Sequence, residues 1–178
     1  MVVAGESQIP LRMKFEGFCP TLLTYDEIPE WYQDNKFVHR GYRPQSNSTR
    51  ACFASWLYIH NKTVNIYSHL LPGILFLIGQ GVMYQYFRDR YPMATIGDRL
   101  ILVLFLLTAA TCLGLSAIYH TLMSHSIDVS HLWLRLDLVG IIVLTLGDFV
   151  SGIYMIFYCE PDLQRMYWTM VRMIDDFA

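Results

Sequence analysis

The sequence predicts an all-α membrane protein with three complete transmembrane helices and one interfacial helix. Of its 178 residues, 54% are apolar and 16% are charged, which is too apolar a composition for one soluble domain. Three segments are nearly free of charge over about the 20 residues that a helix needs to cross a bilayer. Helices are the expected structure, because open sheet edges leave backbone groups unpaired in lipid.

Charge and cysteine content exclude other classes of protein. The net charge of -2, from 13 basic and 15 acidic residues, provides no basic stripe that could follow a phosphate backbone, so we expect no nucleic-acid partner. The cysteines show no Cys-x-x-Cys pair and are expected to be free thiols: Cys19, Cys52, Cys112 and Cys159. Charged residues interrupt the first twenty positions, so we expect no cleaved signal peptide.

Residues 1–49 form the predicted N-terminal segment. They mix charged and aromatic residues with prolines, which is typical of a solvent-side segment that is loosely ordered at first and has no large core. Residues 50–67 are the predicted interfacial helix. The apolar run 51–59 is too short to span a bilayer, and Trp56 and Tyr58 suit the depth of the lipid headgroups.

Residues 68–160 are the predicted three-helix transmembrane region, with spans at 69–87, 100–119 and 138–159. Asp148 is the one acidic residue within these runs. Residues 161–178 carry too much charge for a fourth span, so we expect an incomplete fourth helix or a divergent tail. Lys and Arg counts near the spans favour neither orientation.

Small residues on the second span predict close packing against another helix. Ala110, Gly114 and Ala117 lie at steps of four and three residues, so they share a face that lets a neighbouring backbone approach. Ordinary packing within the bundle is the expected use of this face.

Polar residues at the ends of the second and third spans form the candidate site. Ser116 and His120 are four residues apart and share a helical face, and Asp137 begins the third span. A turn covering roughly residues 124–133 would bring His120 and Asp137 to one depth. Such a pair is a partial metal site or an acid and base pair. Alternatively, His120 donates to a backbone carbonyl and Asp137 caps its helix.

Asp148 lies eleven residues after Asp137, so the two carboxylates share a face and Asp148 lies about 16 Å deeper. A charge at that depth is a candidate functional residue. The alternative is a protonated carboxyl group that is hydrogen-bonded within the bundle and faces protein.

Four ordered sequence blocks resemble the progestin and adipoQ receptor family, which includes adiponectin receptors and hemolysin III proteins. Residues 116–126 match its Ser-x-x-x-His-x-x-x-x-His-Ser pattern. The other blocks that resemble this family are Asp34-Asn35 with Gly41-Tyr42-Arg43-Pro44, the stretch from His60 to Leu70, and Leu136-Asp137 with Gly140-Ile141.

The resemblance implies a seven-helix bundle with a cytosolic N-terminus and a zinc site near the cytosolic helix ends. His120 matches a zinc ligand, and Ser116 and Asp137 match catalytic polar groups beside the water that zinc binds. The implied activity is hydrolysis of lipid amides such as ceramide, in which zinc polarises the carbonyl and activates water. The implied roles are reception and signalling in lipid metabolism and metal homeostasis, through lipid products or an extracellular protein ligand.

This sequence departs from the family pattern mainly at its end. The family's other two zinc ligands form a His-x-x-x-His pair on the seventh helix, which these residues do not reach. We therefore expect a truncated member, a splice form or an incomplete gene model that is inactive alone and binds zinc weakly. Lys62 stands where the family often has Glu, and Asp148 where small or neutral residues are common.

Two alternative functions remain open. One is a non-catalytic membrane module that pairs with full-length relatives, as a homo- or hetero-oligomer, through faces such as the one at Gly114. The other is a proton or ion pathway through Asp137 and Asp148. All the hypotheses place the protein among membrane lipids as a multi-pass protein of the plasma membrane or an endomembrane.

Overall fold

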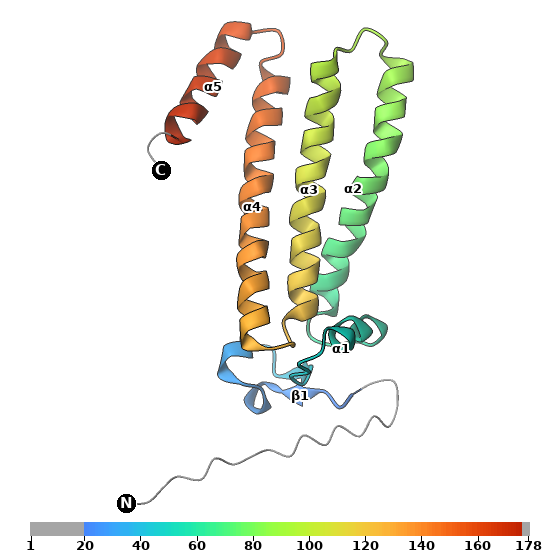
Figure 1. Cartoon of the computed structure of the whole chain (residues 1–178), viewed down its shortest axis with the longest axis vertical. Coiled ribbons are helices and arrows are strands. Elements are labelled where there is room, and N and C mark those ends of the chain that lie inside the picture. Colours follow the sequence, from blue (N-terminus) through green and yellow to red (C-terminus); the bar gives the residue numbers. More distant parts are fainter. Residues whose placement is uncertain (1–19, 176–178) are drawn as a thin grey trace, which may run out of the picture.

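Three long helices form the body of the protein. The structure is a computed structural model that describes residues 20–175. Helices α2 (Thr63–Arg90), α3 (Ile96–Leu122) and α4 (Ile127–Ile156) stand side by side, joined by short connections at alternate ends (Figure 1). Their lengths of 28, 27 and 30 residues exceed the roughly 20 that cross a bilayer. All three are apolar enough to span it, so the all-α membrane fold is confirmed.

The helices begin earlier than the hydropathy of the sequence indicates. Helix α4 begins at Ile127, eleven residues before the expected start at residue 138, and the turn between α3 and α4 is only residues 123–126. The polar residues in its first turns, Asp128 and Arg135, are exposed, which is why the hydrophobic pattern did not include them. The short turn changes the depth at which residues of α3 and α4 face each other.

Small residues bring the three helices together. A Cβ added at Gly73 of α2 would lie 3.4 Å from Leu113 Cβ and 3.8 Å from both Ala110 O and Gly114 N. Part of the small-residue face of α3 therefore packs against α2, which is the ordinary bundle packing expected for it. Ala117 is buried as well.

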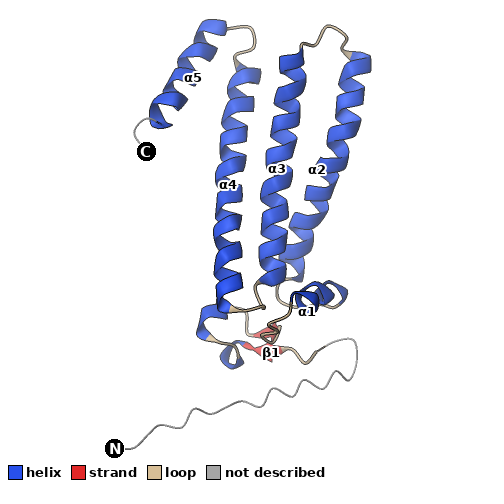
Figure 2. Cartoon of the chain, in the orientation of Figure 1, coloured by secondary structure: helices blue, strands red, loops and turns tan. Residues whose placement is uncertain are grey.

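The N-terminal segment forms a small folded layer beneath the bundle. Strands β1 (Leu23–Thr24) and β2 (Arg40–Tyr42) pair antiparallel, and two 3-10 turns, η1 (Tyr25–Glu27) and η2 (Glu30–Tyr32), lie between them. Figure 2 shows this small sheet at the same end of the molecule as the turn between α3 and α4.

This layer has a small core of its own, which agrees with the expectation that the segment has no large one. Its buried members are Ile28, Tyr32, Tyr42 and Met123, of which Met123 follows α3. The tyrosine rings of Tyr32 and Tyr42 meet edge to face at 5.8 Å between centroids. The aromatic residues that suggested a loose segment thus attach it to the bundle. Residues 1–19, including Cys19, lie outside the described part.

The predicted interfacial helix, 50–67, is divided in the structure. Helix α1 (Thr49–Ala54) continues into the 3-10 turn η3 (Ser55–Leu57), and α2 already begins at Thr63. Ser48 begins α1 as its N-cap, and its side chain accepts a hydrogen bond from Ala51 N. The boundary expected at residues 67 and 68 therefore falls inside α2.

Helix α5 (Pro161–Asp175) occupies the predicted tail and is too short, at 15 residues, to count among the spans. It folds back beside the end of α4 (Figure 1). The rings of Phe157 and Tyr167 stack with centroids 4.6 Å apart, and Gln164 Nε2 donates to Tyr154 O at 3.3 Å. The three cysteines within the described residues, Cys52, Cys112 and Cys159, are free thiols.

Candidate metal centre beneath the bundle

Ser116 and His120 meet a second histidine near the start of α2. His69 Nδ1 and Ser116 Oγ are 2.8 Å apart, which joins α2 to α3 by a side-chain hydrogen bond. The rings of His69 and His120 have centroids 5.7 Å apart. Ser116 is 6% exposed, and both histidines are half-buried. Two imidazoles and one hydroxyl therefore gather on one side of α3, close to its C-terminal end.

His120 has a ring nitrogen without a hydrogen-bond partner. Its Nδ1 atom is buried and has none among the described residues. Tyr119 packs a ring 4.9 Å from the imidazole, centroid to centroid. The alternative considered from the sequence, in which the ring donates to a backbone carbonyl, is not supported at Nδ1. A buried nitrogen with no partner is costly unless a ligand satisfies it.

Asp137 lies deeper in the bundle than His120. A Cβ added at Gly140 of α4 would lie 3.1 Å from Cys112 Cα, so these two residues face each other. Three residues back along α4, Asp137 is then level with Leu115 and about 7 Å deeper than His120. Within residues 20–175, no hydrogen bond or ion pair joins Asp137 to His120 or Ser116. The four-residue turn accounts for this difference from the expected common depth.

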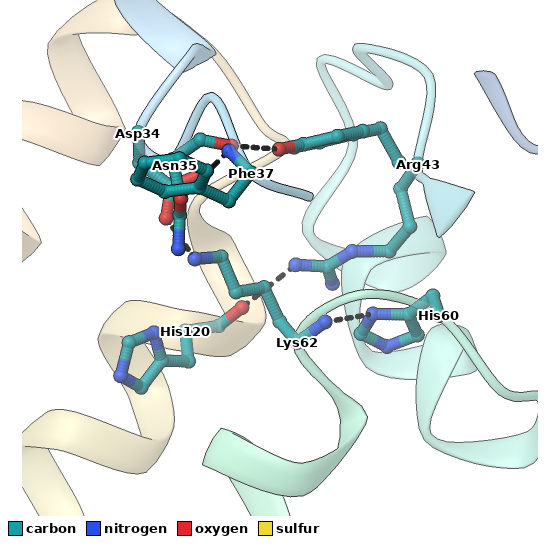
Figure 3. Close-up of polar contacts among 8 residues, drawn as sticks. Asp34, Asn35, Phe37, Arg43, His60, Lys62 and His120 are labelled. Carbon is teal, nitrogen blue, oxygen red and sulfur yellow. Dashed lines mark hydrogen bonds and ion pairs between the residues drawn. The ribbon is translucent and has the colours of Figure 1, made fainter. Parts of the chain in front are cut away.

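Arg43 holds the end of α3 from below. Its guanidinium donates from Nη2 to His120 O at 2.7 Å (Figure 3). Nη1 donates to Thr121 O at 2.9 Å. Nη1 also donates to Ser55 Oγ at 2.8 Å, and Arg43 is 2% exposed. The last carbonyls of a helix lack intrahelical partners, so a buried guanidinium both satisfies them and suits the helix dipole. The candidate ligand is thereby tied to the N-terminal segment.

Two further cationic or basic groups lie beside Arg43. The buried Lys62 forms an ion pair with Asp34, which is exposed (Figure 3). His60 is 6% exposed, and its Nδ1 accepts a hydrogen bond from Lys62 N at 3.1 Å. Burial, together with the positive charges of Arg43 and Lys62, lowers the pKa of His60 to about 3. His60 is therefore neutral at physiological pH.

A cavity of about 860 Å³ lies at the opposite end of the bundle. Asp148 of α4 lines it together with Asp98 of α3, and most of the other lining residues are apolar. Tyr154 OH donates to Asp98 at 2.7 Å. Asp148 is exposed in this chain, and its carboxylate has no hydrogen bond or ion pair within the described part of the chain.

Comparison with known proteins identifies the family. A family model described as Haemolysin-III related matches residues 57–175, which include the three long helices and the His69, Ser116 and His120 cluster. The chain belongs to the haemolysin-III related family. The expected resemblance is thus confirmed at the level of family.

Curated relatives of this haemolysin-III related chain are named as receptors. It is 38% identical over 151 residues to the adiponectin receptor protein of Drosophila melanogaster, covering 84% of this chain and 33% of that protein. It is 37% identical over 137 residues to an ADIPOR-like receptor of Saccharomyces cerevisiae, covering 75% and 42%. It is 34% identical over 158 residues to human progestin and adipoQ receptor family member 3, covering 88% and 49%. The chain spans about a third to a half of the length of these relatives.

The cluster in this haemolysin-III related chain fits part of a zinc site. The unpartnered Nδ1 of His120 is suited to a metal, and neutral imidazole is a common zinc ligand. Within the described residues, no group of three or more His, Cys, Asp or Glu side chains could hold a metal ion. A catalytic zinc site generally has three protein ligands, so His120 would fill one position of such a site.

The sequence did not reveal the roles of one residue of this cluster, His69, and of Arg43 beneath it. His69 entered the sequence analysis only within the family block from His60 to Leu70, because its partner lies 47 positions away on another helix. Arg43 was noted only as part of a family block. The sequence around a basic residue such as Arg43 does not indicate which helix end its side chain will cap, because that helix is distant in the chain.

Proposed function

We propose that this receptor-like membrane protein carries part of a zinc-dependent hydrolase site for lipid amides of the ceramide type. The observation that supports the proposal most is the buried, unpartnered Nδ1 of His120 beside Ser116 and His69. The family and its receptor-named members support a membrane signalling role. The proposal includes three further components, which are the ceramide-type substrate, the bound zinc and an extracellular protein ligand.

The residues have separate roles in this proposal. His120 would hold the metal through a ring nitrogen. When bound, zinc supplies Lewis-acid polarisation of a carbonyl and lowers the pKa of water. The Ser116 hydroxyl lies one turn from His120 and can hydrogen-bond a substrate or solvent oxygen. Asp137, deeper in the bundle, is the candidate general base. Activity requires metal ligands beyond those found within the described residues.

We further propose that the N-terminal segment lies in the cytosol, at the plasma membrane or an endomembrane. Asn47-Ser48-Thr49 is an acceptor pattern for N-glycosylation, and Asn47 is exposed beneath the bundle. A cytosolic segment hides it from the lumenal enzyme, so Asn47 stays unmodified. The measurement is gel mobility before and after glycosidase treatment. A shift that Asn47→Gln abolishes would reverse the orientation.

The metal part is tested by zinc titration of the purified chain. We expect weak binding that mild chelation removes, because one or two ligands compete poorly with water and buffer. His120→Ala should abolish this binding, while His131→Ala, at an exposed histidine of α4, should leave it unchanged. Equal binding in the His120→Ala variant would refute a site at His120.

The catalytic part is tested by complementation. A full-length relative whose own matching second-helix histidine is replaced by alanine is expressed with this chain, and hydrolysis of a fluorescent ceramide is measured. Recovery of hydrolysis with the wild-type chain but not with His120→Ala supports the proposal. No recovery despite stable co-purification favours the second candidate function below.

The second candidate function is a non-catalytic module that pairs with full-length relatives. It is favoured by the lack of a three-ligand group in the described residues. The face containing Ala110 and Gly114 already packs on α2, so pairing would use another surface. The outer face of α4 offers exposed apolar side chains, including Leu138, Ile142 and Phe149. Co-purification that His120→Ala does not disturb, without complementation, would establish this function.

A further inference from the structure

Hydroxyl side chains within α3 and α4 bond mostly to their own helix. Five of them donate to the carbonyl oxygen four residues earlier, at 2.5 to 3.0 Å: Thr108, Thr111, Thr121, Thr145 and Ser151. This is the common arrangement for Ser and Thr inside a helix, where no water competes. A hydroxyl group bonded in this way has its proton directed along its own helix.

Ser116 has a different partner. Its Oγ atom lies 2.8 Å from His69 Nδ1 on α2, and its position four residues before His120 places it beside that imidazole. One of the two atoms donates and the other accepts, according to the tautomer of His69. In either case the contact directs the Ser116 hydroxyl toward α2.

We infer that His69 is a positioning residue of the candidate site, which holds the Ser116 hydroxyl beside His120 in the orientation that a ligand meets. This inference makes the proposed function more specific. Its predicted effect on metal affinity rests on that proposed function. The contact between His69 and Ser116 stands on geometry alone. Groups that orient the surroundings of a metal ligand alter metal affinity by about 10- to 100-fold when they are removed.

The contact is tested without metal, by nitrogen NMR of histidine-labelled full chain in detergent. Ser116→Ala should shift the His69 Nδ1 resonance and leave those of His131, which is exposed on α4, unchanged. An unchanged His69 resonance would overturn the inference, whatever the metal results.

The positioning role is tested by two amide variants. An Asn amide atom takes the place of Nδ1, because both are bonded to Cγ, while a Gln amide reaches the place of Nε2. The metal-free readout is the thermal midpoint of the full chain. His69→Asn should keep the wild-type midpoint, and His69→Gln should lower it as far as His69→Ala does. Equal losses in the Asn and Gln variants would contradict the inference.

Metal affinity then separates this inference from the proposed function. With Co²⁺ as the probe, His69→Ala and Ser116→Ala should each weaken binding by about 10-fold, and the double variant no further, because the residues act as one unit. Additive losses would mean that His69 acts independently of Ser116 and would overturn the inference. If His120→Ala binds Co²⁺ like the wild type, the proposed metal site fails, while the NMR and thermal results still decide whether His69 positions Ser116.

Discussion

Arg43 Nη2 donates a 2.7 Å hydrogen bond to the carbonyl oxygen of His120, the residue that we propose as a metal ligand. The same guanidinium binds Thr121 O, so both bonds lie on the last turn of α3. Because Arg43 immediately follows strand β2, the folded N-terminal layer and the candidate site are mechanically joined. Any movement of that layer would therefore be transmitted to the end of α3.

The hydrogen bonds from Arg43 to the last turn of α3 predict that replacing Arg43 greatly lowers the stability of the protein. Arg43→Ala should lower the free energy of unfolding by about 2–4 kcal/mol, because it leaves the carbonyls of His120 and Thr121 without their charged donor. Arg43→Lys should recover little, since an ammonium group cannot reproduce the fork of the guanidinium. Thermal unfolding in detergent measures both.

Arg40 supplies the control for this prediction. It lies on strand β2, three residues before Arg43, and is exposed, so Arg40→Ala should change stability by less than about 0.5 kcal/mol. Equal effects at the two positions would show that the guanidinium of Arg43 is not the source of the stability.

Hydropathy was sufficient to predict the three spans, because lipid requires long apolar helices of a narrow range of lengths. It was not sufficient to locate the start of α4, since the exposed polar residues there, such as Arg135, look like a loop in sequence. The expected turn over residues 124–133, longer than the observed turn at 123–126, placed Asp137 level with His120, whereas the packing of Gly140 on Cys112 puts it deeper.

The candidate site was only partly predictable for a related reason. Ser116 and His120 share a face through local helical spacing, which the sequence displays directly. The pairing of Ser116 with His69 depends on how α2 and α3 are aligned, and Gly73 sets that alignment by close approach. Such tertiary contacts leave no periodic signal along the chain.

Acid should destabilise the N-terminal layer through His60. Its pKa is about 3 in the folded protein and ordinarily about 6.5, so between these values the unfolded chain binds a proton that the folded chain does not. The free energy of unfolding should therefore fall as the pH is lowered below about 6.5, by at most about 1.4 kcal/mol per pH unit. Thermal midpoints at pH 7 and pH 5 measure this loss.

His60→Asn should remove this acid dependence, because an amide oxygen can accept from Lys62 N without binding a proton. His39 is exposed, so His39→Asn should leave the dependence unchanged and serves as the control. If the midpoint of the His60→Asn variant falls between pH 7 and pH 5 as much as that of the wild type, another group causes the loss.

Two glycines of α4 should respond oppositely to alanine. A Cβ added at Gly147 would lie 2.8 Å from Thr108 Cγ2 and 2.9 Å from Thr108 Cβ, and nothing lies within 4 Å of one added at Gly152. Gly147→Ala should destabilise the protein by about 1–3 kcal/mol through overpacking between α3 and α4. Gly152→Ala should be neutral or stabilise by up to about 1 kcal/mol, since alanine favours the helix. Thermal unfolding that ranks the two in the reverse order would contradict this packing.

The two carboxylates of the large cavity should also differ. Asp98 accepts hydrogen bonds from Tyr154 OH at 2.7 Å and from Thr95 N at 2.7 Å, which cap the start of α3 and link it to α4. Asp148 has no such partner within residues 20–175, although it too lines the cavity. Asp98→Ala should therefore lower the free energy of unfolding by about 1–3 kcal/mol.

Asp148→Ala should leave the stability of the chain unchanged or raise it, because a carboxylate within an apolar span is costly when nothing pairs with it. Membrane abundance and thermal midpoint are measured together for Asp148→Ala, Asp148→Asn and Asp98→Ala. A loss in Asp148→Ala that Asp148→Asn restores would mean that the carboxyl group is hydrogen-bonded within the bundle, contrary to this prediction.

The same two variants test whether Asp148 takes part in the reaction. If both accumulate normally but neither supports ceramide complementation, whereas the wild-type chain does, the carboxylate carries a proton or an ion for the reaction. Normal complementation by both would remove the support for a proton pathway through Asp137 and Asp148, because asparagine keeps the shape of the side chain but cannot carry the charge.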